Sequence, residues 1–146
     1  MKETFQIREV QIQYGRKRTA SYDSIKGPSS AVGFLRKIAP NNSQEHVIAV
    51  YLDAGNTPIG YSVVSTGLAA SCPIHPREVY QRAIALGSYS IILAHNHPSG
   101  DCTPSGEDLK VTKQMREAGA VVGIKVLDHV IFSDSGFYSM QENGQF

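Results

Sequence analysis

The chain has 146 residues, of which 41% are hydrophobic and 18% charged, with a formal net charge of +1 at pH 7. This length suits one domain, which can bury about two-thirds of the surface that the unfolded chain exposes. No apolar run approaches the ~20 residues that span a bilayer, and charges interrupt the first ten positions, which argues against a signal peptide. The near-neutral net charge gives no indication of nucleic-acid binding. We expect a soluble, cytoplasmic protein without membrane contacts.

The N-terminal part predicts an edge strand, a loop and a helix. In the first 27 residues apolar side chains alternate with polar ones but change parity midway, as in an edge strand with a bulge, and turn-forming residues follow. We expect this segment to pack on the same domain as residues 28–146. Ser29 or Ser30 is expected to cap a helix with Val32 and Leu35 on its apolar face.

A hairpin and a second helix are predicted next. Residues 47–52 form a continuous apolar run, and residues 59–65 follow a turn as the antiparallel partner strand. Pro76 suits the first position of a helix, and Gly87 suits its end.

Two histidines end the next predicted strand, over residues 89–95. His95 and His97 are separated by one residue, and on an extended chain such side chains point to the same face. Pro98 and the turn formers after it end the strand. One metal ion can therefore contact both imidazoles.

A carboxylate follows at the start of a predicted helix, over residues 105–118. Ser105 and Asp108 precede an apolar-periodic segment in the pattern of a capping box, with Ser105 as the cap, and Gly119 is expected to end the helix. Such a pair is often a cap and nothing more. After two histidines on one strand face, however, Asp108 also offers a third metal ligand.

The C-terminal part predicts three strands, over residues 121–127, 129–132 and 137–140, with a turn before the last. The mixed order of helices, strands and hairpins predicts an α/β fold with a mixed sheet flanked by helices.

The ligand set of His95, His97 and Asp108 suits Zn²⁺, one ion per chain. Three protein ligands leave a fourth position for water, which is typical of a catalytic site. The same set also describes a non-heme iron site, and the residues alone do not separate the two metals. A Cys102 thiolate would fill the fourth position and displace the water. We instead expect Cys72 and Cys102 to be free thiols, because two cysteines make no disulfide framework.

The spacing of His95, His97, Ser105 and Asp108 resembles the JAMM motif of the JAB/MPN metallopeptidase-like superfamily. Three segments, His-Asn-His-Pro-Ser-Gly-Asp, His-Pro-Arg-Glu and Leu-Asp-His, resemble motifs of its RadC branch. The resemblance covers the chain from about residue 28 to its end. It implies a single JAB/MPN-like domain, layered as in cytidine deaminases, and a zinc metallopeptidase with a protein or peptide substrate.

This sequence differs in one respect from full-length RadC proteins, which carry an N-terminal helix-hairpin-helix region. This sequence has no segment that matches that region. The family's traditional description as DNA repair proteins therefore gains no support from this chain.

In the superfamily, a glutamate at the head of a strand acts as general acid and base, and the matching position here is Glu45. The Ser105 hydroxyl is expected to donate to the carbonyl oxygen as it becomes negative. Glu78 is the rival base, although a first-turn acid is also favoured by the helix dipole alone.

Of the three further histidines, His75 and His129 are candidates for extra ligands, although the spacing of His46 and His75 does not recruit them. We expect His129 to be a packed residue that is hydrogen-bonded within its strand, and we assign no role to His46 or His75. Two other functions stay open: a non-catalytic module that associates with protein or nucleic acid, and a DNA-processing metalloenzyme. The sequence indicates neither the substrate nor the oligomeric state.

Overall fold

The computed structural model describes residues 9–11, 22–67 and 74–146. Within these ranges the chain forms three helices and five strands, in the order α1 (Pro28–Ile38), β1 (His46–Leu52), β2 (Pro58–Thr66), α2 (Pro76–Ala85), β3 (Ser90–Asn96), α3 (Gly106–Val122), β4 (Lys125–Phe132) and β5 (Phe137–Ser139). The strands make one sheet in the order β2-β1-β3-β4-β5, in which only β3 and β4 run parallel. The predicted α/β fold with a mixed sheet is confirmed.

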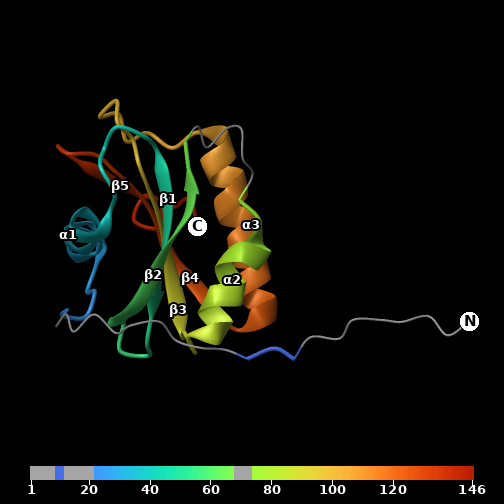
Figure 1. Ribbon diagram of the computed structural model, residues 1–146. Helices are drawn as coiled ribbons and strands as arrows, with labels where there is room; N and C mark the ends of the chain where they lie inside the picture. The colour runs from blue at the N-terminus through green and yellow to red at the C-terminus, as the bar shows by residue number, and fades with distance from the viewer. Residues whose placement is uncertain (1–8, 12–21, 68–73) are drawn as a thin grey trace, which may run out of the picture.

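The sheet separates two apolar cores. α1 covers one face, and α2 and α3 cover the other (Figure 1). Alternate residues of β1 and β3 enter each core, so both strands are buried along their whole length. Their continuous apolar runs follow from this position, since a strand buried on both faces has no polar side.

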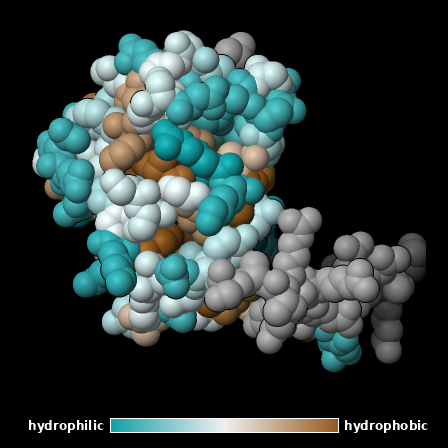
Figure 2. Space-filling model, turned by 90° about the vertical axis from the view of Figure 1, so that its left-hand side faces the viewer, coloured by the Kyte–Doolittle hydropathy of each residue, from teal (hydrophilic) through white to brown (hydrophobic). Residues whose placement is uncertain are grey.

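β2 lies at the edge of the sheet and is only partly covered. Three of its side chains, Ile59, Tyr61 and Val63, are 37–42% exposed. Tyr61 and Val63 pair with β1 residues that belong to the α1-side core. Figure 2 looks onto the α1 side of the molecule, where apolar surface shows between hydrophilic patches. α1 therefore does not shield that face of the sheet completely.

The predicted end of α3 at Gly119 is wrong, because the helix continues to Val122 and ends before Gly123, whose φ is 82°. Gly119 is buried inside the helix, where a Cβ would lie 2.4 Å from Tyr80 Oη and from the carbonyl oxygen of Ile124. Glycine is present there for close packing against α2, and the left-handed end falls at the next glycine.

Two other boundaries differ from the predictions. α1 begins at Pro28, with Gly27 as its cap, so neither Ser29 nor Ser30 caps it. Ser30 instead sits in the first turn, and its hydroxyl accepts the N–H of Lys26. The two strands predicted over residues 121–132 are one strand, β4, which begins at Lys125 because α3 takes up the preceding valines.

Most of the predicted N-terminal strand, and Cys72, lie outside the described residues. Residues 9–11 are described and are exposed, outside any helix or strand. In the described ranges, no helix combines the length and the hydropathy needed to cross a membrane.

Candidate metal centre

The two predicted histidines meet at the C-terminal end of β3. His95 lies in the strand and is 1% exposed, whereas His97 follows the strand and is partly exposed. Their Nε2 atoms are 3.0 Å apart, and the ring centroids are 4.7 Å apart. The structure thus brings both imidazoles to one point, as expected for side chains two residues apart on an extended chain.

Two carboxylates approach the same point from other elements. Glu45 is the residue before β1. The antiparallel pairing of β1 with β3 places Val47 opposite His95. Glu45 Oε1 lies 3.9 Å from His95 Nε2 and 3.6 Å from His97 Nε2. Asp108, in the first turn of α3, places Oδ1 3.4 Å from His95 Nε2. Strand pairing and helix packing therefore join residues from three segments of the chain.

These side chains form a donor set that can hold a metal ion. One ligand atom each from Glu45, His95 and His97 lies within 4.8 Å of the other two. Asp108, which the sequence predicts as a ligand, is close to His95 but does not complete that trio. Glu45, which the sequence predicts as the base, belongs to it. Both carboxylates are thus available to the centre, and distance alone does not divide their roles.

The nitrogen of His97 that faces the centre is an acceptor. Its other nitrogen, Nδ1, is hydrogen-bonded to the carbonyl oxygen of Asp101. Because a carbonyl only accepts, Nδ1 must carry the proton, which leaves a lone pair on Nε2. This is the tautomer that a metal ligand needs.

Ser105 and Asp108 form the predicted capping box at the start of α3. The Ser105 hydroxyl accepts the Asp108 N–H at 3.1 Å, and Asp108 Oδ2 accepts the Ser105 N–H at 2.7 Å. The cap uses one oxygen of the carboxylate and leaves Oδ1 facing His95. Capping and metal binding are therefore compatible in the same residue.

Most of this chain is similar to known proteins. A family model described as the RadC-like JAB domain matches residues 25–145. The chain belongs to this RadC-like JAB family. A UPF0758 protein of Geobacillus thermodenitrificans is 47% identical over 120 residues, which cover 82% of this chain and 53% of that protein. A UPF0758 protein of Shouchella clausii is 42% identical over 122 residues, 84% of this chain and 53% of that protein.

A more divergent relative, a UPF0758 protein of Geotalea uraniireducens, is 37% identical over 136 residues, 93% of this chain and 60% of that protein. The chain therefore spans about half the length of the curated relatives it matches.

In this RadC-like domain, Asn96 holds the segment that carries Glu45. Asn96 is 3% exposed, and its Nδ2 donates to the carbonyl of Gln44 at 2.9 Å and to Asn42 Oδ1 at 2.8 Å. Its Oδ1 accepts the N–H of His46 at 2.8 Å. The bonds to Gln44 and His46 are on either side of Glu45. Sequence reasoning missed this role, because its partners lie about 50 residues away.

His129 is the second residue that sequence reasoning placed differently. It is 2% exposed, and it is bonded to His95 Nδ1 and to Thr112 Oγ1 rather than within its own strand. Burial, together with the neighbouring His95, lowers the pKa of His129 well below its ordinary value of 6.5. The His129 ring is therefore neutral where it touches His95, one of the candidate ligands.

Asp108 is held in its charged form. Burial alone raises the pKa of its carboxyl, but the neighbouring His95 and the bonds from Ser105 lower the pKa below its usual value of 3.8. The net effect is a lowered pKa, so Asp108 is a carboxylate at neutral pH.

The other candidates of the sequence lie elsewhere. Glu78 is exposed in the first turn of α2, where an acid favours the helix dipole. His75 caps that helix, and His46 is bonded to Thr66 and Asn41. Among the described residues, neither these nor Cys102 belong to the group of ligand atoms at the centre.

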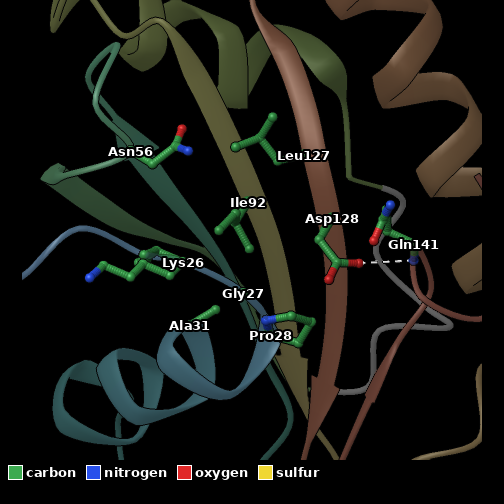
Figure 3. Close-up of a pocket in the computed structure, with 10 residues that line it drawn as sticks. Lys26, Gly27, Pro28, Ala31, Asn56, Ile92, Leu127, Asp128 and Gln141 are labelled. Atoms are coloured by element: carbon green, nitrogen blue, oxygen red, sulfur yellow. Dashed lines mark hydrogen bonds between the residues drawn. The ribbon is translucent and has the colours of Figure 1, made fainter.

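A small pocket lies on the opposite side of the sheet, next to the start of α1 (Figure 3). Its volume is about 170 Å³, below the range of roughly 300–1,000 Å³ for small-molecule sites. Asp128 in its wall already accepts three bonds, from the N–H of His129, the N–H of Gln141 and the hydroxyl of Ser139. No residue of the metal centre lines it, so the pocket is separate from the candidate chemistry.

Proposed function

We propose that this RadC-like domain is a zinc-dependent hydrolase of the peptidase or isopeptidase type, with one zinc ion per chain and a protein or peptide substrate. One observation carries the proposal: Nε2 of His95 and Nε2 of His97 lie 3.0 Å apart, while the other nitrogen of each ring already has a partner. Two carboxylates beside them complete a nitrogen and oxygen donor set that suits zinc.

We assign the ligand role to Asp108, with both histidines, and the proton-transfer role to Glu45. The capping box fixes the Asp108 side chain, which is 12% exposed and charged at neutral pH. Glu45 is longer, 22% exposed, and has only the two histidines as ionic partners among the described residues. A ligand gains from rigidity, whereas a general base must reach more than one atom.

A zinc ion in a site with an open position supplies Lewis acidity, which lowers the pKa of water towards ~7. Glu45 takes one proton from the water that attacks the amide carbon. As the carbon–oxygen bond forms and the carbon–nitrogen bond breaks, Glu45 delivers that proton to the leaving amine.

We assign to Ser105 the stabilisation of the negative charge on the carbonyl oxygen. Its hydroxyl oxygen accepts the Asp108 N–H, which leaves the hydroxyl proton without an acceptor among the described residues. That proton can be donated to the oxyanion. Removal of one such donor elsewhere costs roughly 100- to 1,000-fold in kcat.

Zinc analysis of the purified chain and of two isosteric variants tests the assignment. We expect one zinc per wild-type chain. Asp108→Asn should lose the metal, because an amide is a far weaker ligand than a carboxylate. Glu45→Gln should retain the metal but lose hydrolysis of a peptide and isopeptide library. Loss of zinc from Glu45→Gln with retention in Asp108→Asn would exchange the two roles.

The wild-type results decide between the proposed hydrolase and the non-catalytic alternative. A chain that binds stoichiometric zinc and cleaves amide bonds in the library supports the hydrolase. A chain that binds no zinc, or that binds it and cleaves nothing, favours an association module built on the same fold.

A further inference from the structure

His129 lies beneath the metal centre, and both of its ring nitrogens are occupied. Its Nε2 is 2.8 Å from His95 Nδ1, and its Nδ1 is 2.6 Å from Thr112 Oγ1. Thr112 Oγ1 is in turn 2.6 Å from the carbonyl oxygen of Asp108, one helical turn earlier. All of these side chains except that of Asp108 are nearly inaccessible to solvent. Water therefore does not compete for these bonds.

The direction of each bond in this chain follows from its last member. The Asp108 carbonyl only accepts, so the Thr112 hydroxyl must donate to it. If that proton pointed at His129 instead, two oxygen atoms 2.6 Å apart would face each other with lone pairs alone. A hydroxyl has one proton, so Thr112 Oγ1 must accept from His129 Nδ1–H.

The same reasoning then fixes both imidazoles. A neutral ring carries one N–H, and His129 uses it at Nδ1, which leaves a lone pair on Nε2. That lone pair must accept His95 Nδ1–H. In the neutral ring His95 Nε2 therefore has a lone pair, as His97 Nε2 does, so these two atoms, 3.0 Å apart, suit a bound cation and not a hydrogen bond to each other.

We propose that His129 is a positioning residue of the metal centre: it accepts His95 Nδ1–H and so holds His95 in the tautomer and orientation of a metal ligand. The inference rests on the proposed zinc site for its consequence, but the tautomer itself is a property of the metal-free chain. Asp108 lies near both ends of this chain of bonds, because its carbonyl accepts from Thr112 and its Oδ1 lies 3.4 Å from His95 Nε2. His129 thus supports His95 directly and Asp108 through Thr112.

Nitrogen-15 spectroscopy of histidine side chains in the metal-free protein, at a pH where the rings are neutral, reads the tautomers directly. We expect His95 and His129 both to carry the proton on Nδ1, the form opposite to the one that a histidine in water favours. His46 is a matched internal control, because it is also buried but its ring nitrogens are bonded to Thr66 and Asn41. A proton on Nε2 of His95 would overturn the proposal.

Substitutions at Thr112 test the direction of these hydrogen bonds while both histidines are retained. Thr112→Val keeps the shape but removes the hydroxyl, so the preference of His129, and with it that of His95, should weaken. Thr112→Ser restores the hydroxyl and should restore the wild-type spectrum. If the His95 tautomer is the same in Thr112→Val as in the wild type, the relay is not what fixes it.

Zinc affinity supplies the second readout. His129→Leu removes the acceptor and should weaken zinc binding roughly 10- to 100-fold, the usual effect of losing a bond to a ligating histidine. His129→Gln keeps an acceptor and should recover part of that loss. Equal zinc affinity in the leucine and glutamine variants, both folded by circular dichroism, would assign His129 to packing alone.

The proposal and the proposed function fail separately. If no zinc binds but the metal-free protein shows the predicted tautomers, the hydrolase is contradicted and the positioning role stands. If zinc binds with the predicted stoichiometry but His95 carries its proton on Nε2 in the metal-free chain, the positioning role is contradicted and the hydrolase stands.

Discussion

The side chain of Asn96 accepts the backbone N–H of His46 across 2.8 Å, and this bond ties the start of β1 to the end of β3. The same amide donates to the carbonyl of Gln44. Glu45 lies between those two backbone partners. Asn96, which lies between the candidate ligands His95 and His97, therefore holds in place the carboxylate that the proposed mechanism uses.

Asn96→Asp should destabilise the fold and misplace Glu45. A carboxylate still accepts from His46, but it cannot donate to Gln44 and sets its charge against that carbonyl. Because the site is buried, we expect a loss of roughly 1–3 kcal/mol in the free energy of unfolding, measured by urea titration. Asn42→Ala, which removes one partner of Asn96 at a more exposed position, should cost less. Equal losses would contradict this role.

Gly119→Ala should destabilise the protein, although helix propensity alone predicts a gain of roughly 1 kcal/mol. The new Cβ would lie 2.4 Å from Tyr80 Oη and from the Ile124 carbonyl, and the latter is backbone that cannot move freely. Gly33→Ala is the matched control: it lies exposed in α1, and its Cβ would meet nothing within 4 Å. We expect it to stabilise by about 0.5–1 kcal/mol. Thermal melting of both variants checks the opposite signs.

Substitutions of Ser105 separate capping from catalysis. Ser105→Ala should cost about 1 kcal/mol of stability, whereas Ser105→Gly should cost only a few tenths, because glycine is tolerated as a cap. Both remove the hydroxyl, so both should reduce kcat roughly 100- to 1,000-fold in the proposed hydrolysis. If the glycine variant keeps wild-type kcat, Ser105 is a cap and nothing more.

The sequence predicts local features of this protein well and distant ones poorly. The alternation of side chains along a strand is enough to place His95 and His97 together, and the capping pattern is enough to start α3 after Ser105. The acceptor for His95 could not be predicted in this way. His129 reaches it only because β4 pairs in parallel with β3, 34 residues later.

Gly119 shows the same limit for the fold. From the sequence alone, a glycine at this position predicts the end of a helix. Only the approach of Tyr80 from α2 shows that the glycine is needed for close packing. The parallel β3–β4 pair and the contact between α2 and α3 are set by tertiary packing, which no window of neighbouring residues contains.

Alkaline pH should destabilise the fold through Tyr80. Burial raises the pKa of Tyr80 to about 12, and its hydroxyl donates to the Met115 carbonyl at 2.7 Å. A group whose pKa is raised by folding contributes stability that is complete below its unfolded pKa, near 10, and is lost as pH rises towards 12. Urea unfolding between pH 9 and 12 should show this decline.

Tyr80→Phe is the control for that decline. It should be less stable at pH 8, because the Met115 carbonyl loses its donor, but its alkaline limb should be less steep. Some slope should persist, since burial also raises the pKa of Tyr51. An unchanged slope in Tyr80→Phe would assign the alkaline effect to other groups.

Zinc removal should lower the melting temperature of the wild-type chain. A ligand that binds only the folded state stabilises it by about 2.7 kcal/mol when its free concentration is 100 times Kd. Treatment with a chelator should abolish that increment, and added zinc should restore it. Asp108→Asn keeps an acceptor for the cap but lacks the carboxylate, so its melting temperature should not respond to either treatment. A response of equal size in both proteins would place the stabilising zinc at another site.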